Sequence, residues 1–197
     1  MKLKFLCGTM NSAKTAELLM RNHSLRANGL NVALFKSALD DRSGVENISS
    51  RIGLEAKADG LIFPETDVTK LMFDFIHQNG TPKLILVDEA QFLNAKQIED
   101  LRFIASTLKI PVSCYGLRTD ASSHTFEGSK RLFELCDEIV FFEKYCNCGD
   151  FAIINAKIKN GKVVLPEQTI DIGGEEKYEP MCYKCWLEKL NKREGEH

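Results

Sequence analysis

The segment from Gly8 to Thr15 combines residue types and a spacing that suit phosphate binding. It matches the P-loop pattern G-x-x-x-x-G-K-[ST], except that Ala13 stands in place of the second glycine. In such a loop the backbone N–H groups face a polyphosphate, the lysine adds a charge, and the threonine hydroxyl can bind Mg²⁺. The segment therefore predicts a nucleoside triphosphate site, although a plain strand-to-helix turn is the alternative. The predicted loop consists of Gly8, Thr9, Met10, Asn11, Ser12, Ala13, Lys14 and Thr15.

Two adjacent carboxylates, Asp88 and Glu89, follow directly on the apolar run 83–87. In P-loop enzymes an Asp at the end of a strand holds Mg²⁺ while the metal bridges the phosphates. Asp88 and Thr15 are therefore the predicted magnesium ligands. Glu89 can accept a proton from an attacking hydroxyl or water. With the loop, this pair predicts phosphoryl transfer, whereas a solvated acidic pair at a strand end is the alternative.

The cysteines predict a metal site near the end of the chain. Cys182-x-x-Cys185 has the spacing of zinc ligands, and Cys146-x-Cys148 can supply the second pair, although it is one residue shorter than usual. Gly149 would allow the bend that turns both sulfurs inward. Four free thiols are the alternative. Cys7, Cys114 and Cys136 lie in apolar runs and are expected in the core.

Length and composition limit the class of protein. The 197 residues suffice for one domain with a small appendage, and 44% apolar and 27% charged residues are ordinary for a globular protein. A net charge of −2 argues against a broad basic face for nucleic acid. We expect neither a membrane span nor a signal peptide. Seven cysteines without a secretion signal favour reduced thiols and a cytoplasmic location.

Alternating apolar runs and helical patterns predict an α/β fold with a mainly parallel sheet and ligands at the carboxyl ends of its strands. The expected strands are 2–8, 31–35, 60–63, 83–87, 111–117 and 138–142, and the expected helices are 14–28, 68–76, 95–108 and 129–136. Thr66 or Asp67 is a predicted N-cap, and Asn94 with Gln97 a predicted capping box. Residues 36–44 have loop composition, and residues 45–58 show no clear pattern.

The character of the sequence changes at residue 143. Segments 151–157 and 162–165 predict a two-stranded ribbon joined through Asn160-Gly161. A glycine-containing loop follows at 172–180, and the last dozen residues are charged and expected to be mobile. We therefore predict a nucleotide-binding domain over 1–142 and a small cysteine-bearing subdomain over 143–197.

Several motifs occur together in a characteristic order. They are the loop 8–15, Asp40-x-Arg42, D-E-A-Q-F at 88–92, Y-G-L-R-T-D at 115–120, I-G-G-x-x-x-Y at 172–178, and the paired cysteines. With this set the chain, from residue 3 to about 187, resembles the type II thymidine kinases, which include bacterial enzymes and the cytosolic human one. The resemblance implies transfer of the γ-phosphoryl of ATP to the 5′-hydroxyl of thymidine. It also implies a RecA-like domain, a zinc-ribbon-like subdomain with a "lasso" loop at 172–180, and a homotetramer.

The resemblance also implies roles for single residues. Glu89 matches the catalytic base. Contacts to ATP and its phosphates are implied for residues 8–15, Asp40, Arg42, Asp88 and Gln91. Thymidine contacts are implied for Met10, Phe92, Leu117, Phe126, Ile172, Gly173, Gly174 and Tyr178. The implied partners are ATP and thymidine, with neither nucleic acid nor membrane.

Three positions depart from the family pattern. Ala13 replaces the loop glycine and would cost about 1–2 kcal/mol if the loop requires a positive φ. Ala121 stands where the family usually has Phe beside the nucleoside, and Cys146 is one residue out of register, with Tyr145 in the matching position. Two other functions stay open: a P-loop ATPase acting on nucleic acid, because D-E-A-Q resembles a helicase box, and a family member that binds nucleotide without turnover.

Overall fold

A six-stranded parallel sheet forms the centre of the molecule. The computed structural model describes residues 1–40, 44, 46–159, 162–165 and 177–191. The strands run in the order β5-β2-β6-β7-β1-β8, and all neighbours are parallel. They are β1 (Leu3–Gly8), β2 (Val32–Ser37), β5 (Gly60–Ile62), β6 (Leu84–Asp88), β7 (Val112–Leu117) and β8 (Glu138–Phe142). The predicted mainly parallel sheet is thus confirmed.

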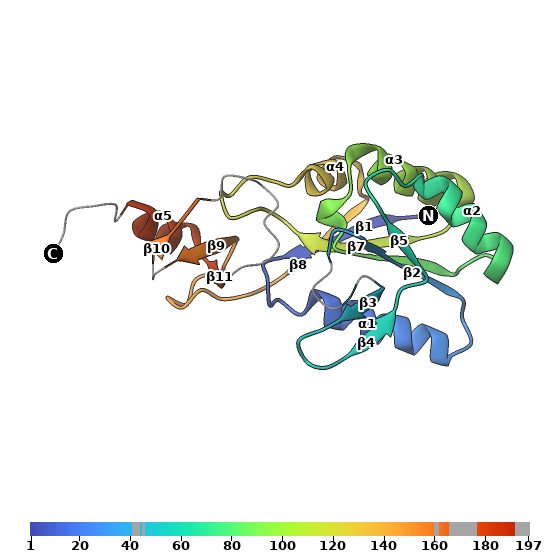
Figure 1. Cartoon of the computed structure of the whole chain (residues 1–197), viewed down its shortest axis with the longest axis horizontal. Helices are drawn as coiled ribbons and strands as arrows, with labels where there is room; N and C mark the ends of the chain where they lie inside the picture. Colours follow the sequence, from blue (N-terminus) through green and yellow to red (C-terminus); the bar gives the residue numbers. More distant parts are fainter. Residues whose placement is uncertain (41–43, 45, 160–161, 166–176, 192–197) are drawn as a thin grey trace.

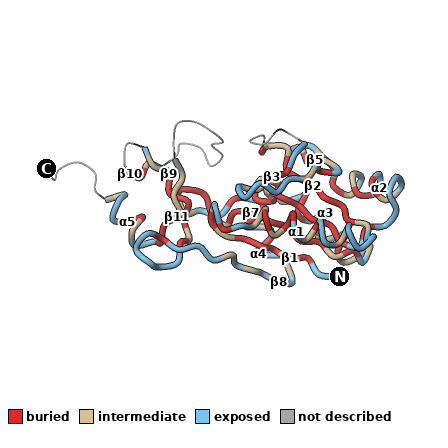
Figure 2. The backbone as a smooth tube through the Cα atoms, turned by 90° about the horizontal axis from the view of Figure 1, so that it is seen from below, coloured by how far each residue is buried: buried red, intermediate tan, exposed pale blue. Residues whose placement is uncertain are grey.

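Helices cover both faces of this sheet (Figure 1). One face carries α1 (Lys14–Ala27), and the other carries α2 (Val68–Asn79), α3 (Ala95–Phe103) and α4 (Glu127–Leu135). A π-helical segment, Ile104–Leu108, continues α3. Because side chains alternate along a strand, Phe5 packs in the core under α2–α4, whereas Leu6 packs with Leu18 of α1. The inner strands β2, β6, β7 and β1 are accordingly buried along most of their length, whereas the edge strand β8 is not (Figure 2).

The predicted helix caps of α2 and α3 are confirmed. The Asp67 side chain accepts a hydrogen bond from the Lys70 N–H at the start of α2. Asn94 and Gln97 form a reciprocal capping box at the start of α3. Among the described helices, none combines the length and the apolar character that crossing a membrane would need.

Strand β2 ends later than predicted, because Lys36 and Ser37 belong to the strand rather than to a loop. Lys36 is 1% exposed, and its ammonium group lies 3.4 Å from the Asp40 carboxylate. It also donates hydrogen bonds to the carbonyls of Gly44 (3.3 Å) and Asn47 (2.9 Å). These partners compensate the burial of the charge, which composition rules alone do not anticipate.

Residues 45–58 contain an unpredicted antiparallel hairpin. Its strands are β3 (Asn47–Ser49) and β4 (Glu55–Lys57), joined by a turn in which the Gly53 N–H donates to the Ser50 carbonyl at 3.0 Å. Each strand has only three residues, too few for a period-two pattern to be recognised. The buried side chain of Ile48 anchors the hairpin in the core beside α1.

The C-terminal part forms a second, antiparallel sheet in the order β10-β9-β11. Its strands are β9 (Ile154–Lys159), β10 (Lys162–Val163) and β11 (Lys177–Met181), followed by α5 (Tyr183–Asn191). The pairing of β9 with β10 confirms the ribbon, although β9 begins later than predicted, whereas β11 and α5 were not predicted. Residues 186–191, expected to be mobile, are helical, since the Trp186 ring is buried in a small local core. Asn160, Gly161 and residues 166–176 lie outside the described residues.

Hydrogen bonds join the C-terminal part of the chain to the P-loop and to the segment that follows β7. The Met10 N–H donates to the Asn155 side-chain oxygen at 2.6 Å, and the Thr119 hydroxyl donates to the Ile153 carbonyl at 3.2 Å. Asn155 is only 3% exposed, so its contact with the loop is shielded from water. The position of the P-loop therefore depends on the cysteine-bearing part of the chain as well as on β1 and α1.

Candidate active site

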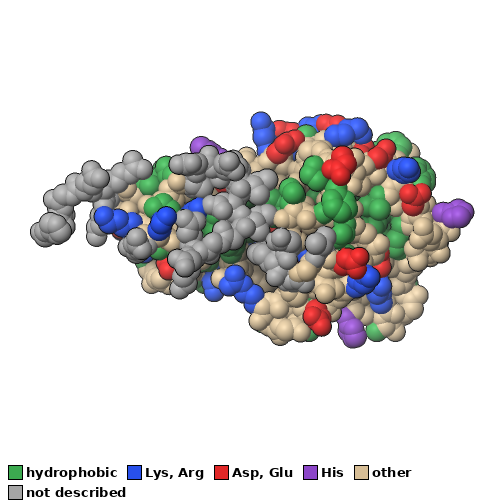
Figure 3. Space-filling model, in the orientation of Figure 1, with side chains coloured by type: hydrophobic (Ala, Val, Ile, Leu, Met, Phe, Trp, Pro, Cys, Tyr) green, Lys and Arg blue, Asp and Glu red, His purple; other side chains and the backbone are tan. Residues whose placement is uncertain are grey.

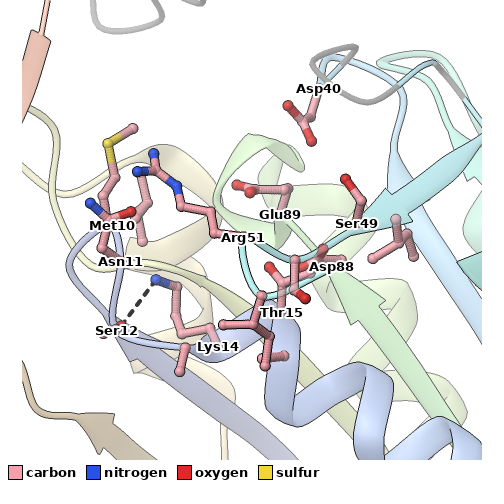
Figure 4. Close-up of a pocket in the computed structure, with 16 residues that line it drawn as sticks. Met10, Asn11, Ser12, Lys14, Thr15, Asp40, Ser49, Arg51, Asp88 and Glu89 are labelled. Atoms are coloured by element: carbon pink, nitrogen blue, oxygen red, sulfur yellow. Dashed lines mark hydrogen bonds between the residues drawn. The ribbon is translucent and has the colours of Figure 1, made fainter. Parts of the chain in front are cut away.

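A cavity of about 470 Å³ lies at the carboxyl ends of β1, β6 and β7. Figure 4 shows the P-loop on one side of it and the acidic side chains on the other. Its lining includes P-loop residues Met10, Asn11, Ser12, Ala13, Lys14 and Thr15, together with Asp40, Asp88, Glu89 and Leu117. Segments that are far apart in the sequence thus meet at the edge of the sheet where the parallel topology predicts a ligand site.

The P-loop is a tight turn between β1 and α1. Ala13 has φ +65°, the left-handed conformation that the missing glycine would adopt more easily. The cost of about 1–2 kcal/mol expected for a non-glycine residue therefore applies here. The Lys14 ammonium group folds back over the loop and donates to the Thr9 carbonyl at 2.7 Å and to the Ser12 hydroxyl at 3.3 Å. The loop thus encloses a positive charge beside the start of a helix.

The two carboxylates follow each other at the end of β6. Asp88 is 5% exposed, and Glu89 adopts φ +51°, which turns the chain sharply into a short 3₁₀ helix, Ala90–Phe92. Burial and the charge of Glu89 raise the pKa of Asp88 to about 7. Figure 4 shows the Thr15 side chain beside Asp88. A hydroxyl and a buried carboxylate whose charge is poorly compensated form a donor set that fits a hard divalent cation.

Asp40 reaches the cavity from the segment that follows β2. It is 6% exposed, and the buried Lys36 pairs with its carboxylate. The buried Lys36 therefore holds Asp40, a predicted phosphate-site residue, in place from the protein interior. Arg42, predicted to act with Asp40, lies outside the described residues.

Other predicted residues do not line this cavity. Gly8 and Thr9 border a neighbouring cleft of about 220 Å³, and Gln91 is 2% exposed within the protein. Phe92 and Phe126 contact each other edge to face, with ring centroids 5.8 Å apart. The remaining predicted positions are Tyr178, on β11, and Ile172, Gly173 and Gly174, outside the described residues. Ala121 is 4% exposed. The roles of all these residues stay predictions.

Sequence reasoning missed the contribution of the β3–β4 hairpin. Ser49, Ser50 and Arg51 line the cavity, and in Figure 4 the Arg51 side chain extends toward Met10 and Asn11. Arg51 is exposed, and in the described part of the chain no hydrogen bond or ion pair engages its guanidinium. The only local signal is an arginine next to a glycine-containing turn, which does not by itself point to a phosphate site.

The four predicted metal ligands come together beside the second sheet, two of them before β9 and two after β11. The sulfur atoms of these residues all lie within 4.8 Å of one another; the residues are Cys146, Cys148, Cys182 and Cys185. Cys146 and Cys148 converge through a turn rather than along a strand: the Gly149 N–H donates to the Cys146 carbonyl at 2.9 Å, and Gly149 has φ +96°. On the other side, the Cys185 N–H donates to the Cys182 sulfur at 3.4 Å. The cluster can therefore bind a metal ion.

The fold and this cavity define a class of protein. A phosphate-binding loop between β1 and α1, facing paired carboxylates at the end of β6, is the arrangement of a P-loop nucleotide-binding protein.

Comparison with known proteins then identifies the family. A sequence profile described as "Thymidine kinase" matches residues 1–186. A thymidine kinase of Encephalitozoon cuniculi is 40% identical over 98% of this chain and 90% of that protein. One from Zymomonas mobilis is 38% identical over 96% of this chain and 98% of that protein. The chain belongs to the thymidine kinase family.

Solved structures add little to this assignment. A Holliday junction branch migration motor from Thermotoga maritima overlaps 74% of this chain and 39% of that chain with a TM-score of 0.41 and 15% identity. A likeness of this size carries no argument about function.

Proposed function

We propose that the protein transfers the γ-phosphoryl group of ATP to the 5′-hydroxyl of thymidine. The observation that carries the proposal is the single cavity in which the P-loop, Asp40, Asp88 and Glu89 meet, in a chain that belongs to the thymidine kinase family. Phosphoryl transfer requires positioning and charge stabilisation more than covalent chemistry, and this cavity offers both.

The proposed roles follow from the chemistry of each group. Lys14 and the loop N–H groups bind the ATP phosphates, and Thr15 and Asp88 would hold a Mg²⁺ ion that neutralises phosphate charge. Glu89 accepts the proton of the 5′-hydroxyl as that oxygen forms its bond to the γ-phosphorus. The bond between the γ-phosphorus and its bridging oxygen breaks, and ADP leaves with that oxygen. Lys14 stabilises the charge that accumulates on it.

Thymidine is proposed to bind beside Glu89. Met10 and Leu117 line the same cavity and offer apolar contacts to the nucleoside. The Phe92–Phe126 pair, Tyr178 and the loop 172–180 are proposed to complete the nucleoside site, as the family resemblance implies. Arg42 and Asp40 are proposed to form a polar pair near the phosphates, as the family resemblance implies.

A panel of nucleosides incubated with ATP and Mg²⁺, with 5′-monophosphate formation measured, tests the proposal. Thymidine should be phosphorylated, and DNA should not stimulate ATP hydrolysis. DNA-stimulated hydrolysis without a nucleoside product would instead favour a nucleic-acid ATPase. On the face drawn in Figure 3, basic and acidic side chains of the described residues are interspersed, which gives that alternative no support. Tight ATP binding without product in a single-turnover assay would indicate a family member without turnover.

Arg51 is proposed to contact the transferred phosphoryl group. Replacing Arg51 with alanine should lower kcat/KM for ATP by about 10–10²-fold, since a guanidinium can make two parallel hydrogen bonds to phosphate. Arg51→Lys should recover only part of the loss because it keeps the charge but not the fork geometry. Steady-state kinetics with varied ATP measure the effect, and Arg131→Ala serves as the control, since Arg131 of α4 pairs with Glu99 and Glu134 outside the cavity. Unchanged ATP kinetics in Arg51→Ala would exclude the contact.

The metal at the cysteine cluster is proposed to be Zn²⁺. Zn–S bonds of about 2.3 Å in a tetrahedron place sulfurs about 3.8 Å apart, and the sulfurs of Cys148 and Cys182 are 3.6 Å apart. Burial opposes ionisation of Cys146, but N–H groups of Cys148 and Cys182 lower its pKa to about 7. Hydrogen bonds with Cys148 and Cys182 raise the pKa of Cys185 to about 12. Four ionised thiolates this close together would repel one another, so they require a bound cation.

Replacing Cys182 with serine should reduce the zinc content from about one ion per chain to nearly none. Activity should fall by about tenfold or more although no cysteine touches substrate, because β9 supports the P-loop through the Asn155–Met10 hydrogen bond. Elemental analysis of protein purified without chelators, with parallel activity assays, measures both effects. Cys136→Ser is the control, since Cys136 lies outside the cluster. Metal-free wild-type protein with full activity and thermal stability would rule the site out.

The organisation of the protein is also a proposal. We propose that residues 1–142 form the nucleotide-binding domain and residues 143–197 the zinc subdomain, supported by the two separate sheets. A homotetramer is proposed from the family resemblance. A cytoplasmic location is proposed because four of the cysteines gather as metal ligands rather than in disulfides. Light scattering should give about four times the chain mass of 22.2 kDa.

A further inference from the structure

Gln91 occupies a position that connects two parts of the proposed active site. It is 2% exposed, and its amide group donates a hydrogen bond to the Glu89 carboxylate. Its carbonyl oxygen accepts the Leu117 N–H at 2.9 Å, at the end of β7. Both ends of the Gln91 side chain are thus engaged by the protein, and the residue does not line the described cavity. This geometry does not suit the direct phosphate contact that the family resemblance implies.

Two glycines allow the backbone around Gln91 to pack this closely. A Cβ atom on Gly116 of β7 would lie 2.6 Å from the Gln91 side-chain oxygen. A Cβ atom on Gly128 of α4 would lie 2.5 Å from the Ala90 carbonyl oxygen and 2.6 Å from that of Leu93. Both distances are far below van der Waals contact. The short helix that carries Gln91 is therefore held between β7 and α4, with little freedom to move.

Glu89 itself requires such support. Its φ of +51° is an uncommon conformation for a residue with a side chain, and such conformations persist where the surroundings hold them in place. A glutamate side chain has three rotatable bonds, so the backbone alone does not fix where its carboxylate points. The hydrogen bond from Gln91 engages one of the two carboxylate oxygens and so restricts the orientation of the group.

We propose that Gln91 is a positioning residue, which holds the Glu89 carboxylate in place for proton transfer and ties it to the strand end at Leu117. This inference rests on the proposed kinase function and on Glu89 as its base. According to this inference, Gln91 affects catalysis by holding Glu89 and does not contact ATP. Errors of about 1 Å in the placement of a catalytic group can cost about 10²-fold in rate, so the effect is measurable.

The decisive variant is Gln91→Glu, which has nearly the same shape. It keeps an oxygen that accepts the Leu117 N–H but loses the amide donor to Glu89. We expect kcat to fall by about 10–10²-fold, with KM for thymidine and for ATP changed by less than about twofold. Gln91→Met, which is neutral and removes both hydrogen bonds, should lower kcat similarly and also raise KM for thymidine, since the Leu117 N–H loses its acceptor.

A double-mutant cycle tests whether Gln91 acts through Glu89. In a Glu89→Gln background no carboxylate remains to be positioned, so adding either Gln91 substitution should change kcat by less than about twofold. Gln97→Glu is the matched control: Gln97 is 3% exposed, donates to the Phe63 carbonyl at 2.7 Å, and caps α3 away from the cavity. It should lower Tm while leaving kcat unchanged.

Two results would overturn the inference. One is a kcat within about twofold of wild type in both Gln91 variants, and the other is an equal loss with and without the Glu89 carboxylate. If Gln91→Glu does not fold, the neutral Gln91→Met decides by the same cycle. Wild-type protein that fails to phosphorylate any nucleoside would reject the proposed function itself. An active wild type with unaffected Gln91 variants rejects only the positioning role.

Discussion

Lys14→Ala is expected to lower kcat for thymidine phosphorylation by at least about 10³-fold, because the P-loop loses the charge that stabilises the transferring phosphoryl group. Lys14 stands at the start of α1 and already folds over the loop, with its ammonium group 2.7 Å from the Thr9 carbonyl. Its removal leaves a polar cavity that water and a cation can fill, so the fold should remain intact. Radiolabelled ATP and thin-layer separation of the products would measure the residual rate.

The control for this experiment is another lysine at the surface. Lys130 of α4 is exposed and lies outside the cavity, so Lys130→Ala should keep the wild-type rate. Thermal unfolding of both variants would separate a lost charge from a lost fold. A Lys14→Ala protein with near wild-type kcat would show that the loop does not bind the transferred phosphate.

Glu89→Gln is expected to lower kcat by about 10²–10⁴-fold, the usual contribution of a general base. The substitution keeps the size of the side chain and its place beside Asp88, but an amide does not accept the hydroxyl proton. Binding of ATP and thymidine should change little, because the proposed phosphate and nucleoside contacts come from other residues. Initial rates across both substrate concentrations would separate kcat from KM.

An exposed glutamate gives the matched comparison. Glu65 lies on the surface outside the cavity, so Glu65→Gln should leave both constants unchanged. A Glu89→Gln variant whose KM for thymidine rises while its kcat stays constant would assign Glu89 to substrate binding instead of proton transfer.

The amino-acid sequence by itself determined the features that are local along the chain. The P-loop, the Asp88-Glu89 pair after a buried strand and the capping box at Asn94 each lie within a few consecutive residues. Their conformations depend on near neighbours, so residue type and spacing suffice to predict them. The alternation of strands and helices likewise determined the parallel α/β fold. The ordered set of these motifs led to the thymidine kinase family, to which the family profile also assigns the chain.

Weak local patterns explain what the sequence did not predict. The β3–β4 hairpin has three-residue strands, and its buried Ile48 gives no periodic signal, so Arg51 was not recognised beside the P-loop. Helix α5 lies in a charged segment that packs into a local core through Trp186, Cys185 and Leu190. In both segments, packing against distant parts of the chain outweighs local composition.

Only the tertiary structure decided which distant residues support the proposed active site. Lys36 is buried behind Asp40, Asn155 binds the loop at Met10, and Gln91 links Glu89 to Leu117. Each of these contacts satisfies a polar group that would otherwise be buried at a cost of about 1–3 kcal/mol. Such requirements arise only when strands and helices pack together and exclude water. No sequence motif encodes them, because the partners are brought together by the sheet rather than by the order of the chain.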